Sequence, residues 1–252
     1  MRSILACFLS LLAVGAFADM VSGNGKVETE RRSVPAFSSI SVGGSGTLRV
    51  HRGARKLEIA CDSNVLPYIT TVVSGGELRI GLKPFTSLGN VTKMEFDVTI
   101  PELEGVSLSG SGNAYIDAFK GNSFEGALSG SGGIKAELEY RTVALKLSGS
   151  GGFDASVKAG RFDLVCSGSG GAYIKGKAEG AAIALSGSAE LGARDFAASD
   201  AKIVASGSSR MEIRAARSLD VTLSGSGELR YWGNPSVSTR VSGSGRVSKA
   251  GD

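Results

Sequence analysis

The chain has 252 residues, 37 of them glycine, and a formal net charge of +4 at pH 7. So small a basic excess, spread along the whole chain, is not the charge pattern of a nucleic-acid-binding protein. One histidine and three cysteines, with no paired spacing, supply no recognisable set of metal ligands. We therefore predict no nucleic-acid partner, no metal and no cofactor.

The first 18 residues have the features of a signal peptide. Arg2 provides a positive start, residues 4–14 form a short apolar run, and residues 16–18 read Ala-Phe-Ala. This pattern is typical of a signal-peptidase site and predicts cleavage before Asp19. The alternative is a lipoprotein acylated at Cys7, although no apolar region precedes that cysteine. We predict an exported protein that is periplasmic, outer-membrane-associated or extracellular. No later apolar run approaches the ~20 residues of a membrane helix, so we do not expect the mature chain to span a membrane.

Residues 19–105 contain strand patterns without a strict period. Residues 37–42 read Phe-Ser-Ser-Ile-Ser-Val, residues 43–46 read Gly-Gly-Ser-Gly, and residues 48–50 read Leu-Arg-Val. This order is typical of a strand, a corner and a second strand. We expect residues 19–105 to form irregular first coils that cover one end of the fold and protect its edge.

A regular repeat occupies residues 106–252. The tripeptide Ser-Gly-Ser recurs at intervals of 20, 19, 19, 19, 20, 18 and 18 residues, beginning at Ser109, Ser129, Ser148, Ser167, Ser186, Ser206, Ser224 and Ser242. A flexible linker needs a composition but no register, so the fixed spacing argues against a linker. Repeats of this length indicate a solenoid, in which each unit covers the core of its neighbour.

Apolar side chains keep one register around the repeated tripeptide. They occupy alternate positions before it, as at Leu145 and Leu147, and again after it, as at Phe153 and Ala155. Such alternation predicts strands with one buried face. Each repeat should therefore be a strand, a Ser-Gly-Ser-Gly corner, a second strand and a variable second turn, such as residues 139–141. Stacked at ~4.8 Å, equivalent strands pair in parallel. The fold class is thus all-β, a right-handed parallel β-helix with about 19 residues per coil, forming a single domain over residues 19–252.

The second residue of the corner is glycine in all eight copies: Gly110, Gly130, Gly149, Gly168, Gly187, Gly207, Gly225 and Gly243. Glycine tolerates a positive φ and allows successive backbones to approach closely. A phosphate-binding loop would continue into Gly-Lys-Ser or Gly-Lys-Thr and begin a helix. A Ca²⁺-binding repeat would carry aspartates in the turn. The corners do neither, so we interpret these glycines as structural.

Several stretches outside the corners are specific in wording and order. They read GNGKVETER at residues 23–31, FSSI at 37–40, VTIP at 98–101 and YWGNPSV at 231–237. Together with the corners, they resemble the head GIN domain proteins, often labelled putative auto-transporter adhesins, over nearly the whole mature chain. The resemblance implies an exported bacterial envelope protein with a right-handed β-helical fold. It carries over no catalytic residue.

One outward side chain stands between the two buried ones after each corner, and we expect these to form a row. The row reads Tyr115, Lys135, Asp154, Tyr173, Gly192, Glu212, Arg230 and Ser248. Lys135 and Asp154 lie on adjacent coils and should form a surface ion pair. Asp154 and Glu212 lie three coils apart, ~14 Å at one strand spacing per coil. That is too far for the paired carboxylates of a glycosidase, so we assign no catalytic residue.

Four aromatic residues are the weak candidates for surface binding: Tyr115, Tyr173, Tyr231 and Trp232. The first two share the outward row but lie three coils apart. The last two are expected to cap the final coils, with ligand binding as the alternative. Cys61 and Cys166 lie among apolar residues, so we expect buried free thiols, with a disulfide as the alternative.

The sequence favours a non-enzymatic, exported cell-envelope β-solenoid that serves in adhesion or binding. Its expected partner is a carbohydrate or a cell-surface protein. An alternative function is a periplasmic polysaccharide lyase or glycosidase on a β-helix scaffold. A third is a structural envelope component that assembles through its ends.

Overall fold

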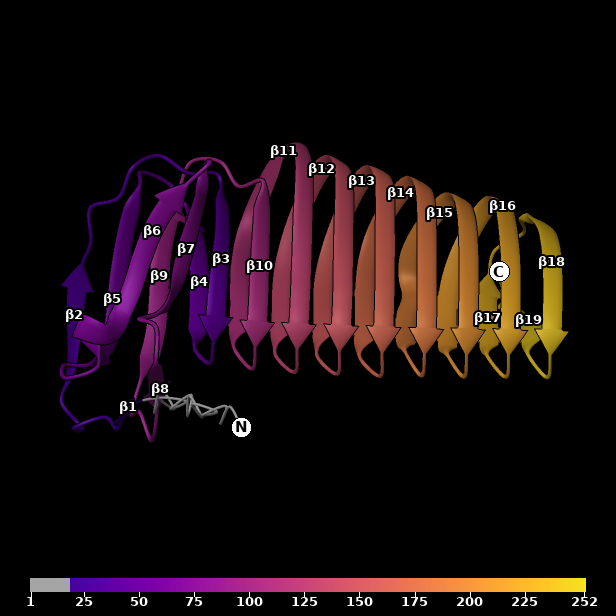
Figure 1. Ribbon diagram of the computed structural model, residues 1–252. Coiled ribbons are helices and arrows are strands. Elements are labelled where there is room, and N and C mark those ends of the chain that lie inside the picture. Colours follow the sequence, from indigo (N-terminus) through magenta and orange to yellow (C-terminus); the bar gives the residue numbers. More distant parts are fainter. Residues whose placement is uncertain (1–18) are drawn as a thin grey trace, which may run out of the picture.

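The computed structural model describes residues 19–252, so the predicted signal peptide and Cys7 lie outside the described residues (Figure 1). The first part contains β1 (Asp19–Val21), β2 (Val27–Arg31), β3 (Ser39–Gly44), β4 (Thr47–Arg52), β5 (Lys56–Asp62), a 3-10 helix (Leu66–Tyr68), β6 (Ile69–Ser74), β7 (Glu77–Leu82), β8 (Thr86–Leu88) and β9 (Met94–Ile100). No helix among the described residues is long and apolar enough to cross a membrane.

The second part is a regular stack of coils. Its strands are β10 (Gly105–Gly110), β11 (Asn113–Gly130), β12 (Gly133–Gly149), β13 (Gly152–Gly168), β14 (Gly171–Gly187), β15 (Glu190–Gly207), β16 (Arg210–Gly225), β17 (Glu228–Trp232), β18 (Ser236–Gly243) and β19 (Arg246–Gly251). Neighbouring coils pair in parallel. Paired residues are separated in the sequence by the length of one repeat, as Leu147 and Cys166 are. The prediction of a parallel β-helix with about 19 residues per coil is therefore confirmed. The right-handedness of the β-helix remains a prediction.

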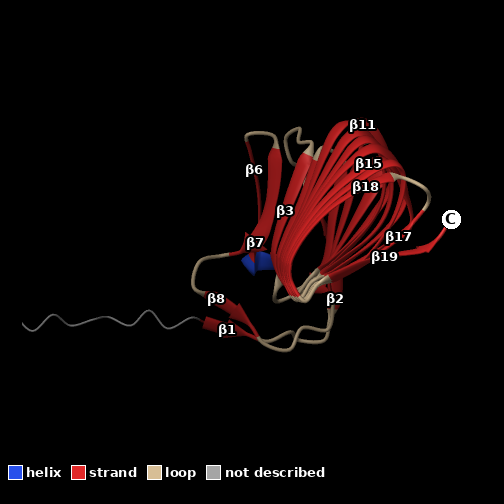
Figure 2. Cartoon of the chain, turned by 90° about the vertical axis from the view of Figure 1, so that its right-hand side faces the viewer, coloured by secondary structure: helices blue, strands red, loops and turns tan. Residues whose placement is uncertain are grey.

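The Ser-Gly-Ser-Gly corners lie above one another along one edge of the stack (Figures 1 and 2). In each corner the second residue has a positive φ, from 90° at Gly187 to 129° at Gly130. Its carbonyl oxygen accepts hydrogen bonds from the next coil, as Gly130 O does from the N–H groups of Ser150 and Gly151, both at 3.0 Å. A Cβ added at Gly149 would lie 2.4 Å from Gly130 O, so the stack leaves no room for a side chain there.

The predicted second turn is wrong, because the chain remains in strand conformation through that region. Strand β12 runs without a break from Gly133 to Gly149 and bends near Tyr140. Tyr140 pairs with Ala159 and Thr142 pairs with Arg161, so only one residue leaves the register between β12 and β13. Pairing shifts further between β14 and β15 and between β15 and β16. The change of direction is spread over several residues, most of which keep pairing partners on the adjacent coils, so β12 and β13 bend without a separate turn. Figure 2 shows this rounded bend opposite the corner edge.

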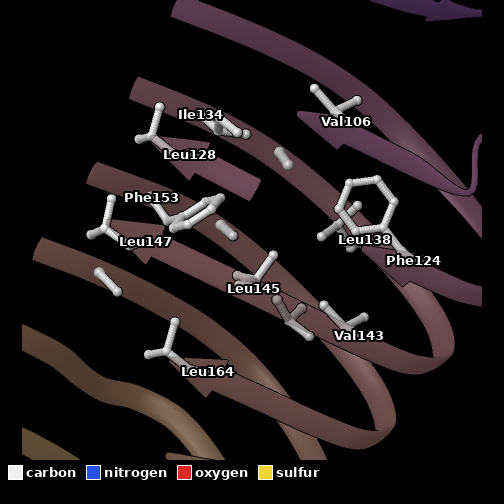
Figure 3. Close-up of a cluster of buried hydrophobic side chains, with 14 of the residues drawn as sticks. Val106, Phe124, Leu128, Ile134, Leu138, Val143, Leu145, Leu147, Phe153 and Leu164 are labelled. Carbon is white, nitrogen blue, oxygen red and sulfur yellow. The ribbon is translucent and has the colours of Figure 1, made fainter. Parts of the chain in front are cut away.

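The core is one continuous stack of apolar side chains between the two walls of each coil (Figure 3). Phe124, Leu145, Phe153 and Leu164 are each at most 2% exposed. Their alternation along the strands places every second side chain inside, as the sequence predicts. Burial of this apolar surface at ~25 cal/mol per Å² is the main stabilising contribution to such a stack.

Tyr140 lies in the bend of β12, and its side chain points inward. It is 4% exposed, and its hydroxyl donates a hydrogen bond of 2.6 Å to the carbonyl oxygen of Leu103. Burial raises the pKa of Tyr140 to about 12. The hydroxyl thus connects the bend to the segment that enters the first regular coil.

We expect Tyr140→Phe to destabilise the protein by ~1–2 kcal/mol at neutral pH, because Leu103 loses its donor. The raised pKa adds a pH dependence: the stabilisation is complete below pH ~10, the ordinary tyrosine pKa, and is lost as the pH approaches the folded-state value. Urea unfolding at pH 8 and pH 11 should therefore show the difference between wild type and Tyr140→Phe shrinking at pH 11. A difference that is the same at both values would contradict the assignment.

The N-terminal end is closed by antiparallel strands. Strands β3 and β4 pair in parallel with β10 and β11 and so continue the coils. On their other side, β3 pairs in parallel with β7, and β4 pairs in parallel with β9. The remaining pairs are antiparallel: β6 with β7, and β5 with both β9 and β2. These strands differ from the irregular coils that the sequence predicts, because alternation of apolar side chains is the same in parallel and antiparallel strands.

A buried carboxylate fixes the first loop of this end. Asp62 is 0% exposed and accepts hydrogen bonds of 2.7 Å from the backbone N–H groups of Gly25 and Thr92. Burial alone would raise the pKa of Asp62, but the backbone donors of Gly25, Thr92 and Lys93 lower it. The GNGK stretch at residues 23–26 is thus a loop folded around this carboxylate.

The C-terminal end differs, because its last coil has no strand beyond it among the described residues. All residues of β18 are exposed, including Val237 and Val241 at the positions that face the core in earlier coils. Arg240, Arg246 and Lys249 place positive charge on this last coil. Charged side chains on an edge strand oppose pairing with another edge.

Candidate functional site

The outward row is continuous along one wall. Tyr115 pairs with Lys135, Lys135 with Asp154, and Asp154 with Tyr173. The Lys135 Nζ and Asp154 Oδ2 atoms lie 3.8 Å apart, and both side chains are exposed. The expected ion pair is therefore present, and it is of the exposed kind that contributes ~0.2–1 kcal/mol.

Tyr115 and Tyr173 flank a shallow groove of 290 Å³ on this wall. The guanidinium carbon of Arg49 lies 5.2 Å from the centroid of the Tyr115 ring. The Tyr173 ring covers Gly192, because a Cβ there would lie 2.7 Å from a ring carbon of Tyr173. The charge of the nearby Glu190 carboxylate, with burial, raises the pKa of Tyr173. The two rings are half-exposed, but Lys135 and Asp154 stand between them, so they form no common platform.

Tyr231 and Trp232 lie in the last coils and belong to the packing. Trp232 is 8% exposed, and the Arg194 guanidinium carbon lies 5.1 Å from its ring centroid. Tyr231 is half-buried against the core. Neither ring offers a free face to a ligand in the way that Tyr173 does.

A larger groove follows the bend. It is not predicted from the sequence. Its volume is 810 Å³, and it crosses the coils from β11 to β16. The floor is a row of small residues, Gly121, Ala159, Ala178 and Ala198, with Tyr140 in the same row. We call this feature the bend groove. A second hollow of 520 Å³ adjoins it and shares several lining residues, extending it towards Arg52.

Two rows of outward side chains form the walls of the bend groove. The first row, which we call the lysine row, pairs Lys120 with Glu139, Glu139 with Lys158 and Lys158 with Lys177, and it continues into Ala197. The opposite wall consists of Arg141, Gly160, Glu179, Ser199 and Ala216. Strand continuity explains this arrangement, because residues on either side of the inward floor row must point outward.

The sequence does contain a signal for the lysine row. Lys120, Glu139, Lys158 and Lys177 are spaced by 19 residues each time, which is the period of the corners. It does not lead to a prediction of the row as long as residues 139–141 and their equivalents are taken as a variable turn, because a turn has no strand register.

The described residues offer little for catalysis. No group of three or more His, Cys, Asp or Glu side chains within residues 19–252 could hold a metal ion. Cys61 and Cys166 are free and buried, as predicted, and burial raises the pKa of both thiols, that of Cys166 to about 11. Such thiols are poor nucleophiles at neutral pH, because the reactive form is the thiolate.

The fold defines the class of protein, a β-solenoid that exposes long, regular walls. A family model described as "Putative auto-transporter adhesin, head GIN domain" matches residues 36–235, so the chain belongs to that family. The resemblance noted in the sequence is thereby confirmed. No curated protein matches the chain.

Solved structures share the architecture. A protein from Parabacteroides distasonis ATCC 8503, described as a putative lipid binding protein, has a TM-score of 0.87 and 26% identity over 92% of this chain and 100% of the other. A putative adhesin from Parabacteroides merdae ATCC 43184 has a TM-score of 0.87 and 24% identity over the same shares. One from Bacteroides fragilis NCTC 9343 has a TM-score of 0.69 and 20% identity over 91% and 100%. The last two likenesses show the fold alone.

Proposed function

We propose that the chain is an exported, non-enzymatic adhesion module of the cell envelope that holds an extended ligand in the bend groove. Membership of the adhesin-labelled family supports a role in binding. The observation that carries the proposal is the bend groove itself, 810 Å³ in volume and continuous over several coils. That volume falls within the ~300–1,000 Å³ range of ligand sites.

The shape of the bend groove favours an elongated ligand. Every coil contributes one floor position, and adjacent coils are spaced by ~4.8 Å. The side chains of the floor row point inward, so the floor is backbone that a chain of repeating units can approach closely between the two outward rows. The strands beneath are paired on both sides, and therefore a peptide cannot bind here by adding a strand.

The carboxylates of the bend groove and of the outward row, within residues 19–252, do not have the arrangement that a polysaccharide lyase or glycosidase needs. A general acid of a glycosidase needs a raised pKa. The hydrogen bond from Lys158 and its charge lower the pKa of Glu139, the carboxylate in the lysine row. On the wall that carries Tyr115 and Tyr173, which we call the tyrosine wall, Asp154 and Glu212 remain three coils apart in register.

Binding to immobilised polysaccharides tests the proposal. We expect the purified protein to bind at least one linear polysaccharide and release no shortened product. Ala197→Trp places a large side chain in the wall of the bend groove and should reduce binding at least about tenfold, as loss of a buried contact does. The matched control is Val165→Trp, at an exposed position on the wall before the corner. Equal binding by the two variants, or turnover of any substrate, would reject the proposal.

A further inference from the structure

The lysine row carries more positive charge than the protein itself neutralises. Lys158 Nζ lies 2.5 Å from Glu139 Oε1, which is the only carboxylate in the row. No carboxylate oxygen among residues 19–252 lies within 4.0 Å of the Lys120 or Lys177 ammonium group. Two lysines of this row are therefore without an ion-pair partner in the described chain.

Two lysines of the lysine row lie opposite each other on adjacent coils. Lys158 and Lys177 are partners in the register of β13 and β14. Like charges at directly opposed positions destabilise a sheet. Glu139 compensates the charge of Lys158 from the coil on its other side, so the charge left uncompensated at this rim of the bend groove is that of Lys177. On the separate wall that carries Lys135 and Asp154, the two partners have opposite charges.

The other charged residues around the bend groove do not cancel the positive charge of the lysine row. The charged residues that line the bend groove and the adjoining hollow are Arg52, Lys120, Arg141, Lys158 and Lys177 on the basic side, and Glu137, Glu139 and Glu179 on the acidic side. Arg141 donates from Nε to Asn122 Oδ1 at 2.7 Å, so its charge has a neutral partner there. The excess over the whole site is positive, and a ligand lying along the backbone floor is flanked by these charges.

We infer that the ligand of the bend groove is a linear acidic polysaccharide whose anionic groups contact Lys120 and Lys177. This inference rests on the proposed function and names its ligand class. A polysaccharide fits better than an anionic membrane, because a flat bilayer cannot follow the floor of a groove walled by two rows of side chains. Anionic groups on the polymer would meet Lys120 and Lys177, which lie three coils apart (~14 Å) on either side of the Glu139–Lys158 ion pair.

The test compares fluorescently labelled oligogalacturonate with a labelled neutral dextran oligosaccharide of similar length, by anisotropy. Wild-type protein should bind oligogalacturonate at least about tenfold more tightly, and this preference should shrink as salt rises, because screening shortens the range of charge interactions. The double variant Lys120→Gln/Lys177→Gln should lose about tenfold in affinity for oligogalacturonate and little for dextran. Lys135→Gln, an exposed lysine on the tyrosine wall, is the matched control.

The remaining outcomes distinguish the inference from the proposed function. Equal losses in Lys135→Gln and in the groove variant would overturn the inference, since general positive charge would then suffice. Binding to phosphatidylglycerol vesicles but not to oligogalacturonate would overturn it in favour of a lipid. If Ala197→Trp abolishes dextran binding while the lysine variant changes nothing, the inference fails and the proposed function stands. Absence of binding to every polysaccharide rejects both.

Discussion

Gly149→Val is expected to destabilise the protein by ~4 kcal/mol or more, which places it among the most damaging single substitutions. Gly149 has a φ of +118°, a conformation that a β-branched residue avoids. Its added Cβ would lie 2.4 Å from Gly130 O, the atom that accepts hydrogen bonds from Ser150 and Gly151. Strain, overlap and loss of the corner hydrogen bonds therefore act together. Thermal melts should show a fall in Tm on the order of 10 °C or more.

Two substitutions control for this result. Gly180→Ala adds a Cβ that meets no atom within 4 Å, so its effect should stay within ~0.5 kcal/mol. Asp154→Ala removes only the exposed ion pair with Lys135 and should change stability by less than ~1 kcal/mol. Equal falls in Tm for Gly149→Val and Gly180→Ala would show that the corner has no special steric requirement.

Phe162→Ala should cost ~3–5 kcal/mol, the usual range for truncating a buried phenylalanine. Phe162 is 0% exposed, and its ring centroid lies 5.0 Å from that of Phe196 at an interplanar angle of 55°. The substitution removes this aromatic contact and leaves a cavity that rigid neighbouring coils cannot close. Phe162 lies in β13 and Phe196 in β15, so the contact spans the coil between them. Because side chains of one coil reach no further than the next coils along the stack, the damage should be local. Hydrogen exchange should accelerate first in β13, β14 and β15.

Val165→Ala is the matched control for Phe162→Ala. Val165 lies three residues further along the same strand, points outward and is 48% exposed. Its truncation should change the free energy of unfolding by less than ~0.5 kcal/mol. A uniform acceleration of exchange over all coils in Phe162→Ala would contradict the view that the stack is stabilised coil by coil.

The corners could be predicted because the same steric requirement recurs in every coil. A stack in which Gly149 O, Gly130 O and their equivalents all accept bonds from the next coil tolerates no side chain, so glycine returns at each copy. The fourth residue of the corner, which is the second glycine position, is less strict. Ala189 and Ser209 replace glycine there without loss of the stack, and both are buried.

The bend could not be predicted from turn chemistry, because it contains no turn. Residues 139–141 read Glu-Tyr-Arg, and the strand simply curves while keeping its pairing. An inward Tyr140 between two outward charged residues is a strand pattern, and the bend groove lies above that pattern. The bend groove becomes visible only in the folded chain. The 19-residue spacing of Lys158 and Lys177 is nevertheless present in the sequence.

The N-terminal closure was beyond sequence reasoning for another reason. Leu57 and Ile59 in β5 alternate with polar residues just as Leu48 and Val50 in β4 do. Whether such a strand pairs in parallel or antiparallel depends on the path of the connecting chain. The buried Asp62, which organises the loop at residues 23–26, gives no signal of its own, since an isolated aspartate is most often exposed.

The most direct test of the account is a crystal structure of the protein soaked with oligogalacturonate. We predict electron density for several sugar units along the bend groove, with carboxylates near Lys120 and Lys177. Density confined to the wall between Tyr115 and Tyr173, or a bend groove that stays empty while the ligand is bound elsewhere, would contradict it.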